Sequence, residues 1–259
     1  MNKGIFCISL DTELLWGRKD LNWESFTYQA DRTRLVIKRL LALFSKYNAP
    51  VTWAIVGKLF EPGPKDGWHG HDIIEMIRKT PLQEIGSHSY SHEIFDQIDY
   101  QKAKSETQNP HHLKSFVFPR NKIKYLEVLK KSGFTNFRSP DESEYELLLP
   151  RVPPVHNPFI DSGLVNIPGS MYLVSGRGYR KYIPAGFRYW KCRLGIDSAI
   201  KHGEIFHIWA HPIDLATDTE KILNDLEKTL IYANNQKNLK IMTMGQISKS
   251  LATSLPPQL

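Results

Sequence analysis

The chain has 259 residues, of which 41% are apolar and 24% charged, a composition typical of a soluble globular protein. This length fits one large domain, and no stretch approaches the roughly 20 apolar residues that span a bilayer. Two cysteines, Cys7 and Cys192, are too few for a disulfide framework. Because the N-terminus also lacks the pattern of a signal peptide, we predict a cytoplasmic protein.

Strand-like runs rich in β-branched and aromatic residues alternate with helix-like segments along the chain. Strands are predicted at residues 4–10, 51–56, 84–87, 115–118, 135–138, 165–167, 204–209 and 239–243. Helices are predicted at residues 31–47, 72–79, 121–132 and 219–235, the first with an apolar stripe of Leu35, Leu40, Leu41 and Phe44. Residues 141–157 are rich in proline and acid and are predicted to form an insertion loop. This order indicates β/α units in a single domain over residues 1–252, followed by a disordered tail at 253–259.

Positive charge is concentrated in one part of the chain. The net charge is +7, and no acid stands between Asp161 and Asp197. Cations and aromatics are interleaved in this interval: Arg177, Arg180, Lys181, Arg188, Lys191 and Arg193, with Tyr179, Tyr182, Phe187, Tyr189 and Trp190. Such a segment suits an anionic membrane surface or a phosphate-bearing glycan carrier, with a solvated loop as the plain alternative. A nucleic-acid partner would rest on basic charge alone, so none is expected.

Two carboxylates, Asp11 and Glu13, follow the first predicted strand. Because side chains alternate along a strand, both should point to the same side. Active sites of β/α barrels are built at the carboxyl ends of the strands, and two adjacent carboxylates repel each other unless a cation or proton lies between them. The alternative is a helix cap with a surface ion pair.

Two histidines, His88 and His92, follow the short strand at residues 84–87 with a spacing of four. On a helical turn this spacing brings two imidazoles to one metal. Together with Glu13 they offer two nitrogens and one carboxylate oxygen, which describes a catalytic metal site better than a structural one. Zn²⁺ is the first choice, and Fe, Co, Ni or Mn would also be accepted. Two solvated histidines are the alternative.

A third polar group lies at the end of the strand predicted at 204–209. Alternation puts His207, Trp209 and His211 on one face, with His211 nearest the strand end. His211 is a candidate proton donor across the site from the carboxylates, unless it only bonds a nearby carbonyl. His207 lies deeper in the strand and is predicted to be a hydrogen-bonded core residue.

In this order the three groups resemble the polysaccharide deacetylase family, the NodB-homology domain of carbohydrate esterase family four. The second motif of the family, His-Ser/Thr-x-x-His, stands intact at residues 88–92. In the first motif, Thr-Phe-Asp-Asp-Gly, Asp11 matches the first aspartate and Thr12 replaces the second. Asp11-Thr12-Glu13 looks like the branch that spaces its carboxylates as Asp-x-Asp or Asp-x-Glu. Where the family carries Arg-x-Pro-Tyr, this chain has Phe118-Pro119-Arg120-Asn121, with the arginine displaced.

The resemblance implies an α/β fold, a distorted (β/α) barrel of about seven strands. It also implies a metal-dependent carbohydrate deacetylase, which is a hydrolase of carbon–nitrogen bonds other than peptide bonds, or of acetyl esters, with N-acetyl favoured. Glu13, His88 and His92 would then bind the metal, Asp11 would be the general base and His211 the acid. Arg120 would orient the base, bind substrate or cap a helix.

The His-Pro context of His211 is similar to that of family members linked to surface-polysaccharide synthesis. The expected substrate is therefore a carbohydrate, linked to a lipid diphosphate or a nucleotide. Segment 177–193 would make peripheral contact with the anionic inner face of a membrane.

Two other functions are compatible with the same residues. The first is a hydrolase of linear or cyclic amides that are not sugars. The second is a non-catalytic, glycan-binding relative, which the replacement of the second aspartate by Thr12 favours. The survival of Asp11, His88, His92 and His211 favours an enzyme.

Overall fold

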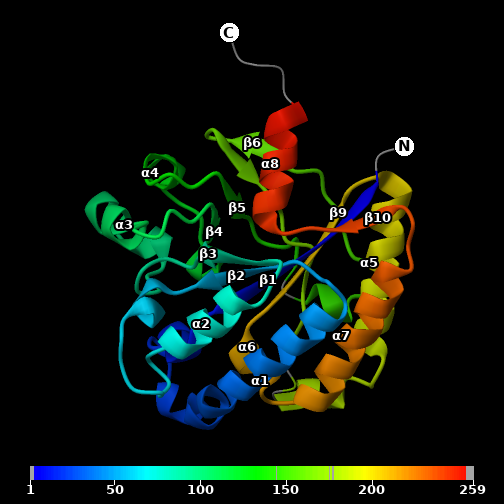
Figure 1. Ribbon diagram of the computed structural model, residues 1–259, viewed down its shortest axis with the longest axis horizontal. Helices are drawn as coiled ribbons and strands as arrows, with labels where there is room; N and C mark the ends of the chain where they lie inside the picture. Colours follow the sequence, from blue (N-terminus) through cyan, green and yellow to red (C-terminus); the bar gives the residue numbers. More distant parts are fainter. Residues whose placement is uncertain (1–2, 144, 175, 177, 255–259) are drawn as a thin grey trace.

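A curled, mostly parallel sheet forms the centre of the molecule in the computed structural model (Figure 1), which describes residues 3–143, 145–174, 176 and 178–254. The strands are β1 (Gly4–Thr12), β2 (Val51–Ile55), β3 (Gln83–Ser87), β4 (Ser115–Val117), β5 (Asn136–Arg138), β6 (Phe159–Asp161), β7 (Leu164–Asn166), β8 (Met171–Tyr172), β9 (Ile205–Ala210) and β10 (Leu239–Ile241). Their order is β6-β7-β5-β4-β3-β2-β1-β9-β8, and β10 pairs with the start of β1. Neighbouring strands are parallel except β6 and β7, which form an antiparallel hairpin.

The longer helices cover the outer face of the sheet. The helices are α1 (Thr27–Lys46), α2 (His71–Lys79), α3 (Tyr100–Glu106), α4 (Leu126–Lys131), α5 (Phe187–His202), α6 (Pro212–Leu215), α7 (Thr219–Asn234) and α8 (Met244–Ser254). In Figure 1, α1, α2, α5 and α7 lie below and to the right of the strands, while α8 lies on the opposite side. The predicted distorted β/α barrel is confirmed, although the described sheet has ten strands rather than about seven. The extra strands are short: neither β6 nor β8 was predicted.

Strand β1 is central because both of its faces are buried, as is typical of a parallel strand covered on two sides. Phe6 and Ile8 belong to the large core shared with the outer helices. Cys7 points the other way and packs with Met244 and Ile247 of α8 in a second cluster. The face that carries Cys7 is therefore the inside of the curl. Because side chains alternate, every second residue from Cys7 to the C-terminal end of β1 lies on this face.

Helix α1 buries a stripe that differs from the predicted one by one residue. Leu35 is 53% exposed, whereas Val36 and Ile37 are buried with Leu40 and Phe44. The stripe that fits a period of 3.6 residues therefore runs through Val36 and Ile37, and Leu35 faces solvent. Near the C-terminus, α8 continues to Ser254, so the predicted tail boundary at 253 is too early by two residues, and residues 255–259 lie outside the described residues.

The basic segment 177–193 is not one exposed patch. Its second half begins helix α5, in which Arg188 and Lys191 are buried. The Lys191 ammonium donates to the backbone carbonyls of Leu149 and Arg151 at 3.0 and 2.6 Å, so this charge holds the preceding loop in place. Arg177 lies outside the described residues.

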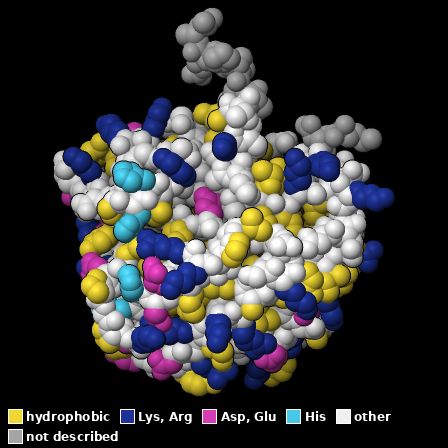
Figure 2. Space-filling model, in the orientation of Figure 1, with side chains coloured by type: hydrophobic (Ala, Val, Ile, Leu, Met, Phe, Trp, Pro, Cys, Tyr) yellow, Lys and Arg dark blue, Asp and Glu magenta, His cyan; other side chains and the backbone are white. Residues whose placement is uncertain are grey.

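Positive charge does not form a single patch on the surface drawn in Figure 2 either. On the face drawn in Figure 2, lysine and arginine side chains are spread among other residues rather than gathered together. Among the described residues, none of the helices combines the length and hydropathy needed to cross a bilayer.

Candidate active site

A pocket of about 680 Å³ opens at the carboxyl ends of β1 and β9. All six residues that the sequence predicts for the site line it: Asp11, Glu13, His88, His92, Arg120 and His211. Strand alternation explains why Asp11 and His211 both face the pocket. Asp11 lies on the inner face of β1 with Cys7 and Ser9, and His211 follows His207 and Trp209 on the inner face of β9.

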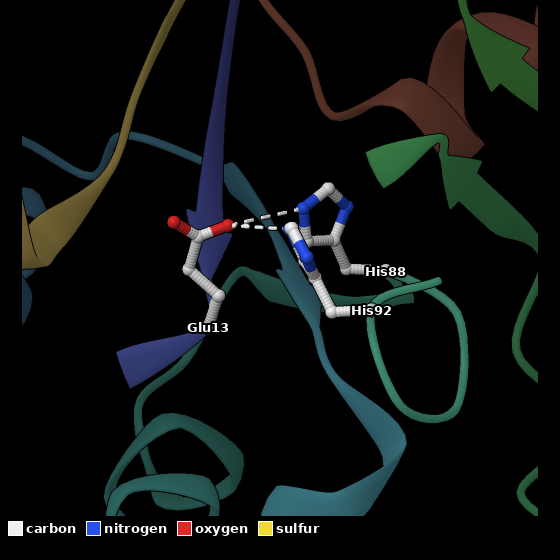
Figure 3. A group of neighbouring side chains, drawn as sticks. All are labelled: Glu13, His88 and His92. Carbon is white, nitrogen blue, oxygen red and sulfur yellow. Dashed lines mark ion pairs between the residues drawn. The ribbon is translucent and has the colours of Figure 1, made fainter. Parts of the chain in front are cut away.

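Glu13 and the two histidines line this pocket, and their side chains point toward one another (Figure 3). The Glu13 Oε2 atom lies 3.0 Å from His92 Nε2 and 3.4 Å from His88 Nε2. One ligand atom from each residue lies within 4.8 Å of the other two, and all three side chains are buried. Burial alone would raise the pKa of Glu13, but His211 and Arg18 more than offset this and hold it well below its usual range. Glu13 is therefore an anionic ligand.

The donor set fits a divalent cation because of how His88 is oriented. Its Nδ1 lies 2.9 Å from the carbonyl oxygen of Val117, which can only accept, so Nδ1 carries the proton. A proton on Nδ1 leaves Nε2 as the ring atom that faces the Glu13 carboxylate, and a cation between the two groups would be bound by the lone pair of Nε2. Burial is the main factor that lowers the pKa of His92, which keeps its imidazole in the neutral, ligating form.

The histidine pair lies on an irregular turn rather than on the helical turn that the spacing suggested. Ser89 and His92 both have left-handed backbone conformations, with φ of 62° and 60°. The backbone N–H of His92 donates to Ser89 Oγ at 3.0 Å. The buried carboxylate of Glu106 accepts from the backbone N–H and the hydroxyl of Ser91 at 2.7 and 2.6 Å. These bonds hold strained backbone in place, and both imidazoles reach Glu13 from it.

Arg18 supports Glu13 from the side away from the histidines. Its Nη1 donates to Glu13 Oε1 at 2.7 Å, and its Nη2 donates to Asp214 at 3.1 Å. The two oxygens of the Glu13 carboxylate therefore have different partners: Oε1 accepts from the guanidinium, and Oε2 faces the imidazoles. Gly17 packs directly against this carboxylate.

The arginine that binds Asp11 is Arg138, which the sequence analysis missed. Arg138 lies at the end of β5 and donates to both oxygens of Asp11, at 2.8 and 2.7 Å, with both side chains buried. Burial would raise the pKa of Asp11, but Arg138 outweighs it and lowers the pKa. Arg120, the predicted candidate, lies on the pocket wall and donates instead to Asp20 and to the carbonyl of Gly17.

A chain of buried hydrogen bonds continues beneath Asp11. Arg138 also donates to Ser9 Oγ at 2.9 Å, and Ser9 Oγ lies 2.9 Å from His207 Nε2. Burial lowers the pKa of His207 to about 3, so its imidazole is neutral and accepts the Ser9 hydroxyl proton. His207 is thus the hydrogen-bonded core residue that its depth in the strand suggested.

His211 lies across the pocket from these hydrogen-bonded residues and faces the carboxylates of Asp11 and Glu13. Its Nε2 is 3.9 Å from Asp11 Oδ2 and 3.8 Å from Glu13 Oε1. Its Nδ1 is 3.2 Å from Asp214, which also accepts from the Tyr172 hydroxyl at 2.7 Å. Burial would lower the pKa of His211, but Glu13 and Asp214 outweigh it and raise the pKa, which favours the protonated, donating form.

Comparison with known proteins identifies a similar family. Residues 26–128 match the family model for polysaccharide deacetylases. A comparison with curated proteins found no match.

Among solved structures, the chain is similar to a protein assigned as a polysaccharide deacetylase from Mycobacterium smegmatis, at 16% identity and a TM-score of 0.72, covering 100% of this chain and 93% of that one. A similarly assigned protein from Pseudomonas aeruginosa PAO1 matches at 14% identity and a TM-score of 0.74, covering 98% and 92%. The Puue allantoinase matches at 12% identity and a TM-score of 0.71, again covering 98% and 92%. At these low identities the structural likeness shows the fold. The family match confirms the resemblance to polysaccharide deacetylases and the enzyme class that it implies, while the Asp-x-Glu branch stays a prediction.

Proposed function

We propose that this chain, a relative of the polysaccharide deacetylases, is a metal-dependent hydrolase that removes acetyl groups, N-acetyl in particular, from a carbohydrate. The observation that carries the proposal is the convergence of Glu13, His88 and His92 within 4.8 Å. Asp11 and His211 flank this set on the same pocket, where the buried Arg138 orients Asp11 and the half-buried Asp214 orients His211. Three protein ligands beside an acid and a base are what hydrolysis of an acetyl group requires.

The chain's own residues supply the proton transfers. A divalent cation held by Glu13, His88 and His92 would lower the pKa of a water molecule and polarise the acetyl carbonyl. Asp11, kept ionised by Arg138, accepts the proton of the attacking water. His211, protonated because of the neighbouring carboxylates, then donates a proton to the departing nitrogen. An amine leaves poorly without that proton, which is why a raised pKa at His211 suits an N-acetyl substrate.

Two cations at the pocket wall support an anionic substrate, linked to a lipid diphosphate or a nucleotide. Arg180 and Lys122 line the pocket, and neither forms an ion pair with another described residue. The acids of the pocket, in contrast, are bound by buried groups, as Asp11 is by Arg138. A phosphate on the substrate carrier would therefore meet unpaired positive charge at the wall.

We also propose that the exposed part of segment 177–193 makes peripheral contact with an anionic membrane. This contact would be on the cytoplasmic side, as part of surface-polysaccharide synthesis. Lys181 and Tyr182 are exposed there beside the pocket residue Arg180. Co-sedimentation with vesicles of phosphatidylcholine alone or with one-third phosphatidylserine tests this. Binding that rises with anionic lipid and falls with salt is expected, and binding indifferent to both rejects the membrane contact.

A second candidate function is hydrolysis of a linear or cyclic amide that is not a sugar. The structural likeness to an allantoinase favours it, because that fold carries amide hydrolysis of a different substrate. The metal site and the roles of Asp11 and His211 would be the same. The two functions differ in what the pocket wall recognises.

Metal analysis followed by a substrate panel tests the proposal. The purified protein is dialysed with Zn²⁺, freed of excess metal and assayed for bound zinc, with one equivalent expected. Release of acetate is then measured from oligomers of N-acetylglucosamine, UDP-N-acetylglucosamine and acetylated xylan, and ring opening from allantoin. Acetate release from a sugar supports the proposal, and turnover of allantoin alone supports the second candidate. A protein that binds neither metal nor turns over any substrate would be the non-catalytic relative.

A further inference from the structure

Asn121 is a polar pocket residue to which the proposed mechanism assigns no role. It lies in the short turn Pro119–Asn121 that follows β4, and its backbone is left-handed, with φ of 54°. Asparagine tolerates this conformation better than most residues do. The turn places the Asn121 side chain on the wall of the pocket that contains Asp11 and His211.

The amide orientation of Asn121 is determined by its neighbour. Arg138 Nη2 donates to Asn121 Oδ1 at 3.2 Å, and a guanidinium has no acceptor, so the atom facing it must be the oxygen. The amide nitrogen therefore points away from Arg138. Within the described part of the chain, no hydrogen-bond acceptor is found for its two N–H groups, which are free to meet a ligand in the pocket.

Asn121 also lies close to the general base. The same Arg138 Nη2 that binds Asn121 Oδ1 donates to Asp11 Oδ2 at 2.7 Å. A single nitrogen thus holds the base and the amide in one fixed arrangement. Asp11 and Asn121 line the same pocket, so a carbonyl attacked by the water that Asp11 deprotonates would lie on the wall that they share.

We propose that Asn121 is a further catalytic residue, whose Nδ2–H donates a hydrogen bond to the acetyl oxygen as it becomes an oxyanion. The inference rests on the proposed deacetylation. In the addition step, the water oxygen bonds to the acetyl carbon, its proton passes to Asp11 and the carbonyl π electrons move onto the oxygen. On collapse the carbon–nitrogen bond breaks, the nitrogen takes a proton from His211, and acetate and the amine are the products. Asn121 transfers no proton and stabilises only the charge.

Two variants of Asn121 separate this role from structural support of Arg138. N121G removes the amide and suits the positive φ, so the turn is not strained. N121D keeps an oxygen for Arg138 but replaces the donor with a second acceptor. Loss of one oxyanion donor lowers kcat by about 10²–10³-fold, and KM should change little because the bond strengthens only in the transition state. N48G is the matched control, since Asn48 also has a positive φ, 48°, and does not line the pocket.

Kinetics with Zn²⁺ supplied decide the matter, using the sugar that the wild type deacetylates and p-nitrophenyl acetate. The leaving group of the ester needs no proton, so an effect on the ester reports the addition step and not proton donation by His211. Both variants should lose kcat on both substrates, while N48G behaves as the wild type. If the wild type is active and N121D is equally active, the role of Asn121 is overturned and the deacetylase assignment is left intact. A wild type that releases no acetate from any substrate overturns both.

Discussion

Gly17 lies so close to Glu13 that no other residue fits at its position. A Cβ atom placed on Gly17 would come within 2.0 Å of Glu13 Cδ and within 2.1 and 2.4 Å of its two oxygens. The Glu13 side chain cannot simply swing away, because Arg18 and His92 hold it from either side. The absence of a side chain at position 17 is therefore a condition for the proposed metal site.

G17A should lower the affinity for Zn²⁺ by about 10–100-fold, the range typical of changes behind a metal ligand. Isothermal titration calorimetry on the metal-free protein measures this directly. Gly70 provides the control, because its φ is negative and the nearest atom to an added Cβ is 3.0 Å away. Equal affinities of G17A and G70A would show that Glu13 is not the ligand.

Asp11 and Glu13 should respond differently to removal of their charge. D11N keeps the shape of the side chain but cannot accept a proton, so we expect unchanged zinc content and a loss of about 10²–10⁴-fold in kcat. E13A removes a ligand and should lower zinc content itself. Parallel metal analysis and acetate-release assays separate the two. Activity retained by D11N would reject it as the base, and one equivalent of zinc retained by E13A would assign the ligand role elsewhere.

D214N should weaken the proton donor without removing it. The carboxylates around His211 raise its pKa, so the imidazolium persists to higher pH than usual and is lost as the pH rises through that raised value. Without the charge of Asp214 the pKa of His211 falls, and the alkaline limb of the kcat/KM profile should move to lower pH. The profile on p-nitrophenyl acetate should move much less, since its leaving group needs no acid. Identical shifts on ester and amide would contradict this role.

E106Q should destabilise the turn that carries the two histidines. Burial would raise the pKa of Glu106, but its bonds from Ser91 outweigh this and hold the pKa below its ordinary value of 4.5. The stabilisation is therefore fully present above pH 4.5 and is lost as the pH falls through the lower folded-state value. We expect a loss of about 1.5–3 kcal/mol at pH 7 and a smaller one at low pH, from urea unfolding of the metal-free protein. E127Q, at an exposed position on α4, is the control; a difference from the wild type that does not depend on pH would argue against the charge of Glu106.

R180A should raise KM for a phosphate-bearing substrate by about tenfold, because a charge-assisted hydrogen bond contributes about 1.5–3 kcal/mol. The comparison is between UDP-N-acetylglucosamine and uncharged oligomers of N-acetylglucosamine. K181A is a matched control, since Lys181 is the next residue and does not line the pocket. An equal rise for charged and uncharged substrates, or an equal effect of K181A, would remove Arg180 from carrier recognition.

Strand periodicity explains why much of the site could be predicted from the sequence. Asp11 and His211 lie on the faces that two-residue alternation assigned to them, because alternation is a local property of the backbone. Arg138 could not be assigned in this way. Its strand, β5, is separated from β1 by three others, and only the curl of the sheet brings its guanidinium to Asp11.

Asp214 and helix α5 were also not predicted from the sequence, for two different reasons. Asp214 follows His211 by three residues at the start of α6, a spacing that brings side chains together on one turn. Helix α5 was hidden because Arg188 and Lys191 occupy buried positions, where a periodic pattern would show apolar residues. Such buried cations are satisfied by carbonyls of distant loops, which a local pattern cannot reveal.

Helix α8 closes the end of the curl that lies opposite the pocket, where Met244 and Ile247 pack against Cys7 in an apolar cluster. The interior of the sheet is therefore a dead end rather than a tunnel. Substrate has to arrive, and acetate has to depart, through the same opening past Arg180 and Lys122. For the proposed deacetylation, a pocket closed at one end favours acetyl groups on chain ends and side branches over those in the middle of a rigid polymer.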